Sequence, residues 1–354
     1  MCLIFLNNQT NTIPSMSKKI WLLILLISNY SLGYSQINES ADSLITANKK
    51  NVTGDEMQYN IGNGKMLVYN KPRQFGFIRD LPKDAGGIAS TAFKKESVKP
   101  WLLIAGSTAV LLVSDQAITD GVVQFSQNIH LHAEEKNKNL LNFKMGDKNV
   151  SLFRLPANVN TGLYQIGQGF PSLLIGAGLY TYGKINKDYR ALSTASQLAE
   201  AFILMGVSTQ IVKRITGRQS PSESSTPGGN WHFFPSFSKF QNHTPNYDAF
   251  PSGHLATLMS SVTIFSENYP EKKWIKPVGY SLTGLVGYAM INNKVHWASD
   301  YPLALGMGYL CAKQVIKHNR KIENSATSGK KKGEFGYTFN YVNGTLMPGI
   351  VYKF

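Results

Sequence analysis

Two histidines and an aspartate in the second half of the chain are residue types that phosphate-ester cleavage needs. His254 ends the run Pro-Ser-Gly-His that starts at Pro251, and His296 lies further along with Asp300 four positions after it. Residues four apart share one face of a helix, so we expect Asp300 to accept a hydrogen bond from one ring nitrogen of His296. The other nitrogen is then free to attack phosphorus, while His254 protonates the leaving oxygen. This arrangement predicts cleavage through a phospho-histidine intermediate.

A basic cluster upstream of the histidines has the charge to hold a phosphate group. It extends from Lys213 to Pro221 and contains Arg218. The helix expected to start near Ser252 and Gly253 also offers backbone N–H groups, which favour an anion at a helix N-terminus. We therefore assign phosphate binding to Lys213, Arg218, Ser252 and Gly253, and we expect no metal ion or other cofactor.

These three blocks, in this order, resemble the type 2 phosphatidic acid phosphatase superfamily, which also contains vanadium haloperoxidases and bacterial class A acid phosphatases. The family pattern is K-x6-R-P, then P-S-G-H, then S-R-x5-H-x3-D. The second block matches completely, the first keeps Lys213 and Pro221, and the third keeps His296 and Asp300. The resemblance covers roughly residues 98 to 320. It implies an all-α fold, a six-helix bundle, and hydrolysis of phosphate esters.

Both arginines of the family pattern are absent from this chain. Ser220 stands in place of the first, and Ala289 and Met290 stand where Ser-Arg is expected. A guanidinium binds a phosphate through two parallel charge-assisted hydrogen bonds, which neither serine nor methionine can supply. Phosphoryl transfer depends mostly on positioning and charge stabilisation, so the loss bears directly on the rate.

Three other cations are candidates to replace the missing arginines. Arg218 lies two residues before the expected position, Arg214 directly follows Lys213, and Lys294 lies two residues before His296. Arg214 is the poorer candidate because successive residues of a helix point apart. We expect the guanidinium of Arg218 to reach toward the space between the two histidines.

The function that leads is a phosphatase acting on phosphate monoesters or pyrophosphates. Lipid phosphates are its first candidate substrates, with nucleotides or sugar phosphates behind. The alternative is a catalytically weakened or inactive relative that binds phosphate or phospholipid in the cell envelope. Vanadate-dependent halide oxidation ranks third, because a bound vanadate needs the same hydrogen bonds to its oxygens that the two missing arginines would supply.

Each block taken alone also has a purely structural interpretation. Pro-Ser-Gly-His suits a helix start, since Ser is a good N-cap and Pro fits the first turn. Lys213 would complement the dipole at the end of a helix, and His296 with Asp300 would be a structural pair. Order and spacing together favour the catalytic interpretation. His130 and His132 alternate like metal ligands, but no partner set lies near them.

Apolar stretches of helical length follow one another between residues 100 and 318. They lie near residues 100–119, 160–184, 192–216, 253–268, 275–293 and 301–318. On this division Lys213 ends the third helix, His254 opens the fourth, and His296 with Asp300 closes the fifth. All three blocks then meet at one end of a helical bundle.

The segments around this bundle differ in composition. Gly228 to Pro235 belongs to a loop that is rich in aromatic residues, so it suits a wall or lid over the site or a local packing cluster. Alternating aromatics around Asn343 and Gly344 predict a short β-hairpin. We divide the chain into a start with signal peptide (1–35), a polar N-terminal extension (36–97), a phosphatase-like helical domain (98–320), a basic linker (321–333) and a C-terminal β-hairpin (334–354).

The N-terminal segment predicts export. From Met16 the chain reads as a basic, then apolar, then small-residue stretch, which is typical of a secretory signal cleaved after Ser35. Cys311 is then the single cysteine of the mature part, so no intramolecular disulfide is expected. The formal charge of +15 favours anionic surfaces and substrates, an anionic membrane among them. Nucleic acid is not an expected partner, because no reader motif is present.

Whether the bundle spans a membrane depends on its apolar runs. Polar residues such as Asp115, Gln165 and Glu200 interrupt them, and several runs fall below the roughly 20 residues that a span needs. If export delivers residue 36 across the membrane, three crossings would leave Lys213 facing the cytoplasm, opposite to the outward-facing site that is usual for the bacterial lipid phosphatases this chain resembles. We therefore expect a bundle in the periplasm or cell envelope, soluble or membrane-associated, and the alternative is a multi-pass inner-membrane protein.

Overall fold

A computed structural model describes most of the chain beyond its first 48 residues. The described stretches are residues 49–53, 55–133, 137–145, 148–324, 334–342 and 345–353. Residues from Asn51 onward form one compact unit. The predicted signal segment lies outside the described residues, as does most of the predicted basic linker.

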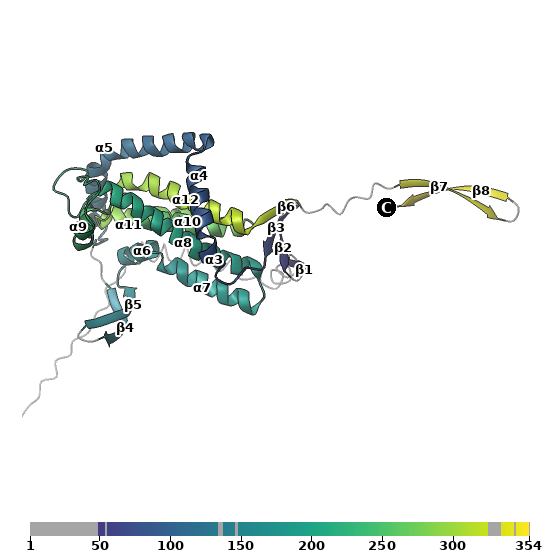
Figure 1. Cartoon of the computed structure of the whole chain (residues 1–354), viewed down its shortest axis with the longest axis horizontal. Coiled ribbons are helices and arrows are strands. Elements are labelled where there is room, and N and C mark those ends of the chain that lie inside the picture. The colour runs from purple at the N-terminus through teal and green to yellow at the C-terminus, as the bar shows by residue number, and fades with distance from the viewer. Residues whose placement is uncertain are drawn as a thin grey trace, which may run out of the picture. The chain divides into compact units, whose positions relative to one another are not determined.

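Long helices dominate the described part, which confirms the predicted helical class. They are α5 (Val98–Asn128), α6 (Val159–Gly167), α7 (Phe170–Ile185), α8 (Tyr189–Thr216), α10 (Gly253–Asn268), α11 (Ile275–Asn292) and α12 (Tyr301–Asn319). α10 packs against α8, α11 and α12 and is the central helix of the bundle. Figure 1 shows these helices running side by side.

The helix count differs from the predicted six. The apolar stretch near 160–184 is divided into α6 and α7 at Gly169, whose φ of +82° favours glycine. A side chain there would also collide with Phe202. Short helices add to the long ones: α3 (Gly76–Arg79), α4 (Leu81–Ala92), α9 (Phe237–Asn242), η1 (Lys95–Ser97), η2 (Thr244–Asn246) and η3 (Ala298–Asp300).

A small sheet adds β-structure that the sequence did not predict in full. It contains β1 (Lys49–Thr53), β2 (Glu56–Gly62), β3 (Lys65–Asn70) and β6 (Lys321–Asn324) in that order. β6 pairs antiparallel with β3 and belongs to the segment that we expected to be a linker. Tyr59, Leu67 and Tyr69 of this sheet pack on Tyr189 and Leu192 of α8.

Two further pairs of strands are hairpins. β4 (Asn137–Met145) pairs with β5 (Lys148–Pro156), and no sequence signal that we used indicated it. β7 (Glu334–Val342) pairs antiparallel with β8 (Thr345–Lys353), with Val342 opposite Thr345. The predicted C-terminal hairpin is therefore confirmed.

The main core lies where α8, α10, α11 and α12 meet. Its buried members include Met205, Leu255, Val286, Met290 and Cys311. The close contact of α12 with α10 requires glycine at position 308, because any side chain there would collide with the Ala256 carbonyl. This packing fixes the N-terminus of α10, where the Pro-Ser-Gly-His motif lies.

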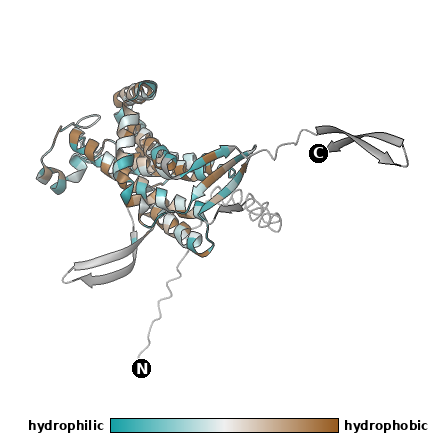
Figure 2. Cartoon of the chain, turned by 45° about the vertical axis from the view of Figure 1, so that its right-hand side comes forward, coloured by the Kyte–Doolittle hydropathy of each residue, from teal (hydrophilic) through white to brown (hydrophobic). Residues whose placement is uncertain are grey.

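The outer surface of the bundle is unusually apolar. Large hydrophobic side chains are exposed on α5, α7, α8 and α11. Figure 2 shows hydrophobic and hydrophilic residues interspersed along the helices of the bundle. Within the described residues, two helices are long and apolar enough to cross a membrane, over 95–128 and 189–216. The prediction that polar residues shorten these runs misses one feature. Asp115 and Glu200 are both fully buried, so they leave the outward faces apolar.

Candidate active site

The end of α8 places Lys213 and redirects the chain. Lys213 lies in the last turn, and Gly217 then adopts a left-handed conformation with a φ of +54° that ends the helix. The next residue, Arg218, turns back into the protein and is fully buried. Lys213 and Arg218 are therefore close in sequence, but the first lies on the last turn of α8 and the second lies beyond the helix, inside the protein.

The start of α10 places His254. Ser252 is the N-cap, and its Oγ accepts a hydrogen bond of 3.4 Å from the N–H of Leu255. The backbone N–H of Ser252 donates to the Asp300 carbonyl at 3.1 Å, so it is not the free anion-binding group that the sequence suggested. The N–H groups of Gly253 and His254 lie in the first helical turn, where no carbonyl of the preceding turn exists.

His296 is held by a backbone carbonyl rather than by a helix neighbour. α11 ends at Asn292, so His296 and Asp300 do not share a helix face as predicted. The His296 Nδ1 lies 2.7 Å from the Ala249 carbonyl and 3.6 Å from Asp300 Oδ2. A carbonyl only accepts, so Nδ1 carries the proton and Nε2 keeps its lone pair.

Asp300 is occupied mainly by other donors. Its Oδ2 accepts from the Trp297 backbone N–H at 2.7 Å, and its Oδ1 accepts from Arg218 Nη1 at 2.5 Å. Both Asp300 and His296 are buried. The carboxylate therefore shapes the turn that carries His296 and lies near its ring.

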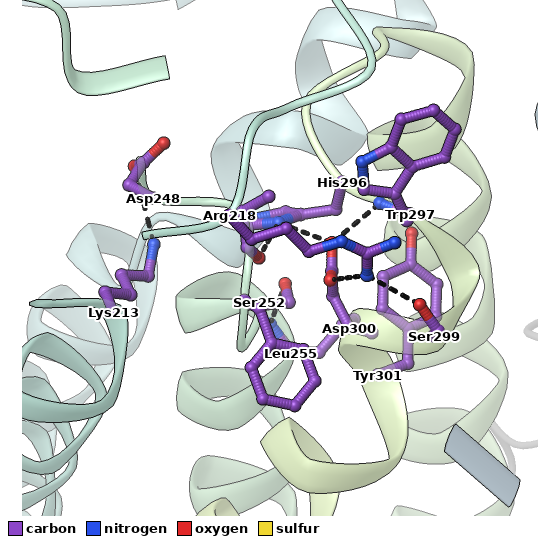
Figure 3. A network of polar contacts seen from close by, with 12 residues as sticks. Lys213, Arg218, Asp248, Ser252, Leu255, His296, Trp297, Ser299, Asp300 and Tyr301 are labelled. Atoms are coloured by element: carbon purple, nitrogen blue, oxygen red, sulfur yellow. Dashed lines mark hydrogen bonds and ion pairs between the residues drawn. The ribbon is translucent and has the colours of Figure 1, made fainter. Parts of the chain in front are cut away.

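Arg218 does not reach the space between the histidines, which corrects the sequence prediction. Its Nη1 donates to Asp300 and to Ser299 Oγ (2.6 Å), and its Nη2 donates to Asp115 Oδ2 (2.7 Å) and to the Gly228 carbonyl (2.8 Å). Figure 3 shows its guanidinium among Asp300, Ser299 and Trp297. Two buried carboxylates neutralise this cation, so its charge is not available to a phosphate in this arrangement.

Asp115 of α5 is a residue whose role the sequence reasoning missed. Besides Arg218, it binds Ser299 twice: Oδ1 accepts from the Ser299 N–H at 2.9 Å, and Oδ2 accepts from Ser299 Oγ at 2.5 Å. Asp115 thereby ties α5 to η3, next to His296. The available signal was an acidic residue in the middle of a long apolar helix, a pattern that marks a specific buried partner.

His254 lies beside His296 with a strongly perturbed proton affinity. The ring centroids of the two histidines are 5.9 Å apart. The ring centroid of Tyr164, a residue of α6, lies 4.9 Å from that of His254. The pKa of His254 is lowered to about 3, mainly by burial, with smaller contributions from the neighbouring His296 and from the positive charge of Lys213. His254 is therefore neutral at pH 7, and Lys213 is close enough to act on it electrostatically.

Lys213 is the buried cation that faces this space. Its Nζ lies 3.5 Å from Asp248 Oδ2, on the side of His296 away from Ser299 (Figure 3). The other proposed cations are elsewhere: Arg214 lies over the Phe237 and Phe240 rings, and Lys294 is exposed. At the two positions where the family pattern has arginine, Met290 is buried in the core and Ser220 is also buried.

The described residues bring together two histidines that could serve as nucleophile and acid, and a buried lysine beside them. His296 offers a free Nε2, His254 faces it, and Lys213 supplies positive charge beside the first turn of α10. Within the described residues, no group of three His, Cys, Asp or Glu side chains comes together in a way that could hold a metal ion. His130 and His132 are among the described residues and belong to no such group.

Comparison with known proteins gives three findings. The family model described as the PAP2 superfamily matches residues 194–322, which include all three blocks. A lipid A 1-phosphatase of Porphyromonas gingivalis is 32% identical over 76 residues, which are 21% of this chain and only 17% of that protein. A transmembrane PAP2-type phosphatidylglycerolphosphate phosphatase from Bacillus subtilis is 17% identical, with a TM-score of 0.35 over 68% of this chain and 94% of the solved one.

Proposed function

The chain belongs to the PAP2 superfamily, and we propose that it is a phosphatase that hydrolyses phosphorylated lipids through a phospho-histidine. The observation that carries the proposal is the state of His296. Its Nδ1–H is donated to the Ala249 carbonyl at 2.7 Å, so Nε2 is the nucleophilic nitrogen.

In the first step His296 Nε2 attacks phosphorus and the bond from phosphorus to the leaving oxygen breaks. His254 gives its proton to that oxygen, and Lys213 with the N–H groups of Gly253 and His254 balances the charge on the phosphoryl oxygens. In the second step water attacks the phospho-histidine while His254 takes the proton of the water. Inorganic phosphate leaves and both histidines return to their initial state.

His254 must carry a proton to act as the acid, although its pKa is about 3 in the ligand-free site. Burial is the main cause of this low pKa, and a phosphate dianion between His254 and Lys213 acts against it, because a nearby negative charge favours the protonated ring. The substrate then brings the acid into its active state, and an empty site leaves it neutral.

A phosphorylated lipid is the substrate class we propose. A lipid A 1-phosphatase is among the similar proteins, and the exposed apolar faces of α5 and α7 suit a protein that meets its substrate in a lipid environment. We place the protein in the cell envelope on the same grounds, with 95–128 and 189–216 as candidate spans.

The alternative, a phosphate-binding relative without catalysis, is favoured by one observation. Arg218 is bound by Asp115 and Asp300, so Lys213 is left as the buried cation beside the histidines. Such a site would bind an anion but would stabilise a transition state less well.

Turnover of the purified full chain separates the two functions. We expect hydrolysis of a chromogenic phosphate ester and of a lipid phosphate, with His296→Ala abolishing both. His243→Ala is the matched control, since His243 is an exposed loop histidine at the end of α9. Phosphate binding without turnover in the unmodified protein would support the binding relative.

A further inference from the structure

Three phenylalanines are exposed on the segment that leads into α9 and forms its first turn. Phe233 is 65% exposed, Phe234 74% and Phe237 71%. We call residues 231–240 the aromatic loop. Large aromatic side chains gathered on one exposed loop mark a surface that contacts something apolar.

The aromatic loop is fastened to the end of α8. The N–H of Phe234 donates to the Ile215 carbonyl at 3.0 Å, and the N–H of His232 donates to the Gly217 carbonyl at 2.9 Å. Phe234 also has a φ of +53°, which a bulky residue adopts only where its surroundings impose it. The phenylalanines are therefore presented outward by a fixed backbone.

An apolar stripe on α8 leads to this loop. Val207, Ile211 and Ile215 repeat every four residues, so they share one helix face, and all three are exposed. The stripe ends at Ile215, where Phe234 is bound. α8 is also one of the two helices that are long and apolar enough to cross a membrane.

Basic side chains follow where the stripe ends. The Arg214 guanidinium lies 5.3 Å from the Phe237 ring and 4.4 Å from the Phe240 ring, and Lys239 is exposed on α9. An apolar face, then aromatic rings, then cations is the order in which residues occur across a membrane–water interface. The formal charge of +15 suits an anionic lipid surface.

We propose that the aromatic loop inserts into the headgroup region of an anionic bilayer and holds the active site at that depth. The link to the site is Trp231, whose ring lies 5.3 Å from Phe250 and 4.8 Å from the Arg218 guanidinium. Phe250 directly precedes the Pro-Ser-Gly-His motif. A phosphate carried by a membrane lipid then reaches His296 from the interface. The lipid-substrate part of this inference rests on the proposed function, whereas insertion of the loop does not.

The first test compares two presentations of substrate. We expect Phe233→Ser with Phe234→Ser to lower kcat/KM for a lipid phosphate in phosphatidylglycerol vesicles about tenfold or more, because two phenylalanines lose their apolar contact. Turnover of a water-soluble chromogenic ester should stay within about twofold. Phe75→Ser with Phe93→Ser is the matched control and should change neither rate, since both are exposed phenylalanines outside the loop. An equal loss on both substrates, or no loss on the vesicles, argues against interfacial docking.

The second test does not need turnover. A fluorophore on Phe233→Cys, in full-length protein reconstituted in phosphatidylglycerol vesicles, should be quenched by lipids brominated near the headgroup end of the chain. The same label on Ile322→Cys, an exposed position of β6, should not be quenched. A label at position 233 that stays in water overturns the proposal. The proposal is also overturned if the label is not quenched by the lipids and is instead buried by contact between two copies of the protein. If no substrate is hydrolysed but the label is quenched, the proposed function fails and the docking surface stands.

Discussion

The Arg218 Nη1 donates to Asp300 Oδ1 at 2.5 Å, with both side chains fully buried. Arg218, which lies inside the first motif block, thus holds the aspartate of the third block. Its backbone carbonyl also accepts from the Ala249 N–H at 3.0 Å, and the Ala249 carbonyl in turn accepts from His296. Arg218 therefore acts on His296 by two routes, and we propose that it is a positioning residue.

Loss of this arginine should destabilise the fold. Arg218→Ala leaves Asp115 and Asp300 buried without their counter-charge, and breaking a buried pair in this way costs about 3–5 kcal/mol. Chemical unfolding of the detergent-solubilised protein measures the change in the free energy of unfolding.

Arg214→Ala is the matched control for that experiment. It removes a partly exposed cation–π contact with Phe240, which is worth about 0.5–1 kcal/mol. If Arg218→Ala keeps the stability of the unmodified protein and instead loses phosphate affinity, Arg218 is a phosphate ligand as the sequence first suggested.

Asp115 should affect catalysis from outside the substrate site. Asp115→Asn weakens the contacts that hold η3, so we expect kcat to fall about tenfold or more through misplacement of His296 while KM for a soluble ester changes little. Asp120→Asn is the control because Asp120 is an exposed acid on the same helix. A rise in KM with unchanged kcat would place Asp115 in substrate binding instead.

The pKa of His254 gives stability a defined pH dependence. Burial, His296 and Lys213 lower this pKa to about 3 in the folded protein, and the ordinary value is 6.5. Protons then prefer the unfolded chain between these values, so the contribution of His254 is present above pH 6.5 and is lost as the pH falls toward 3. Unfolding midpoints between pH 7 and 4 should decline more in the unmodified protein than in His254→Gln.

Vanadate, a mimic of phosphate, offers a second check on the same histidine. NMR titration of the histidine rings should give a higher pKa for His254 when vanadate is bound than in the free protein, with His254→Gln identifying the signal. An unchanged pKa would remove the proposed coupling between substrate and acid.

Restoring the family arginines should not improve this site. Met290 is fully buried in the core between α8, α10, α11 and α12, so Met290→Arg places a charge there without a partner and should destabilise by several kcal/mol, about 3 or more. Met290→Leu keeps the volume and should cost below about 1.5 kcal/mol. A stable, more active Met290→Arg protein would contradict this description of the core.

The sequence predicted the helical class and the order of the motif-bearing elements well. Apolar periodicity located α8, α10, α11 and α12 within a few residues, because each buries one face in a shared core. It missed the division at Gly169, where a backbone conformation rather than hydrophobicity ends α6. It also missed β6, whose pairing with β3 joins segments far apart in the chain.

Side-chain partners were less predictable than elements. His296 and Asp300 have helical spacing, yet a loop and η3 separate them from α11, so the nearest acceptor of His296 is the distant Ala249 carbonyl. Arg218 was placed near the phosphate because of its position in the motif. Its actual partners include Asp115, which precedes it by a long stretch of chain, and only tertiary packing brings the two together.

The most direct test of the proposed chemistry is to trap the phosphoenzyme. With 4-nitrophenyl phosphate, whose leaving group needs little help from an acid, the His254→Ala protein should form the intermediate and hydrolyse it slowly. Rapid quenching followed by peptide mass spectrometry should then find an acid-labile phosphate on His296, and none in His254→Ala with His296→Ala. Turnover of the ester by the unmodified protein without any covalent phosphate, or with the phosphate on another residue, would contradict the mechanism.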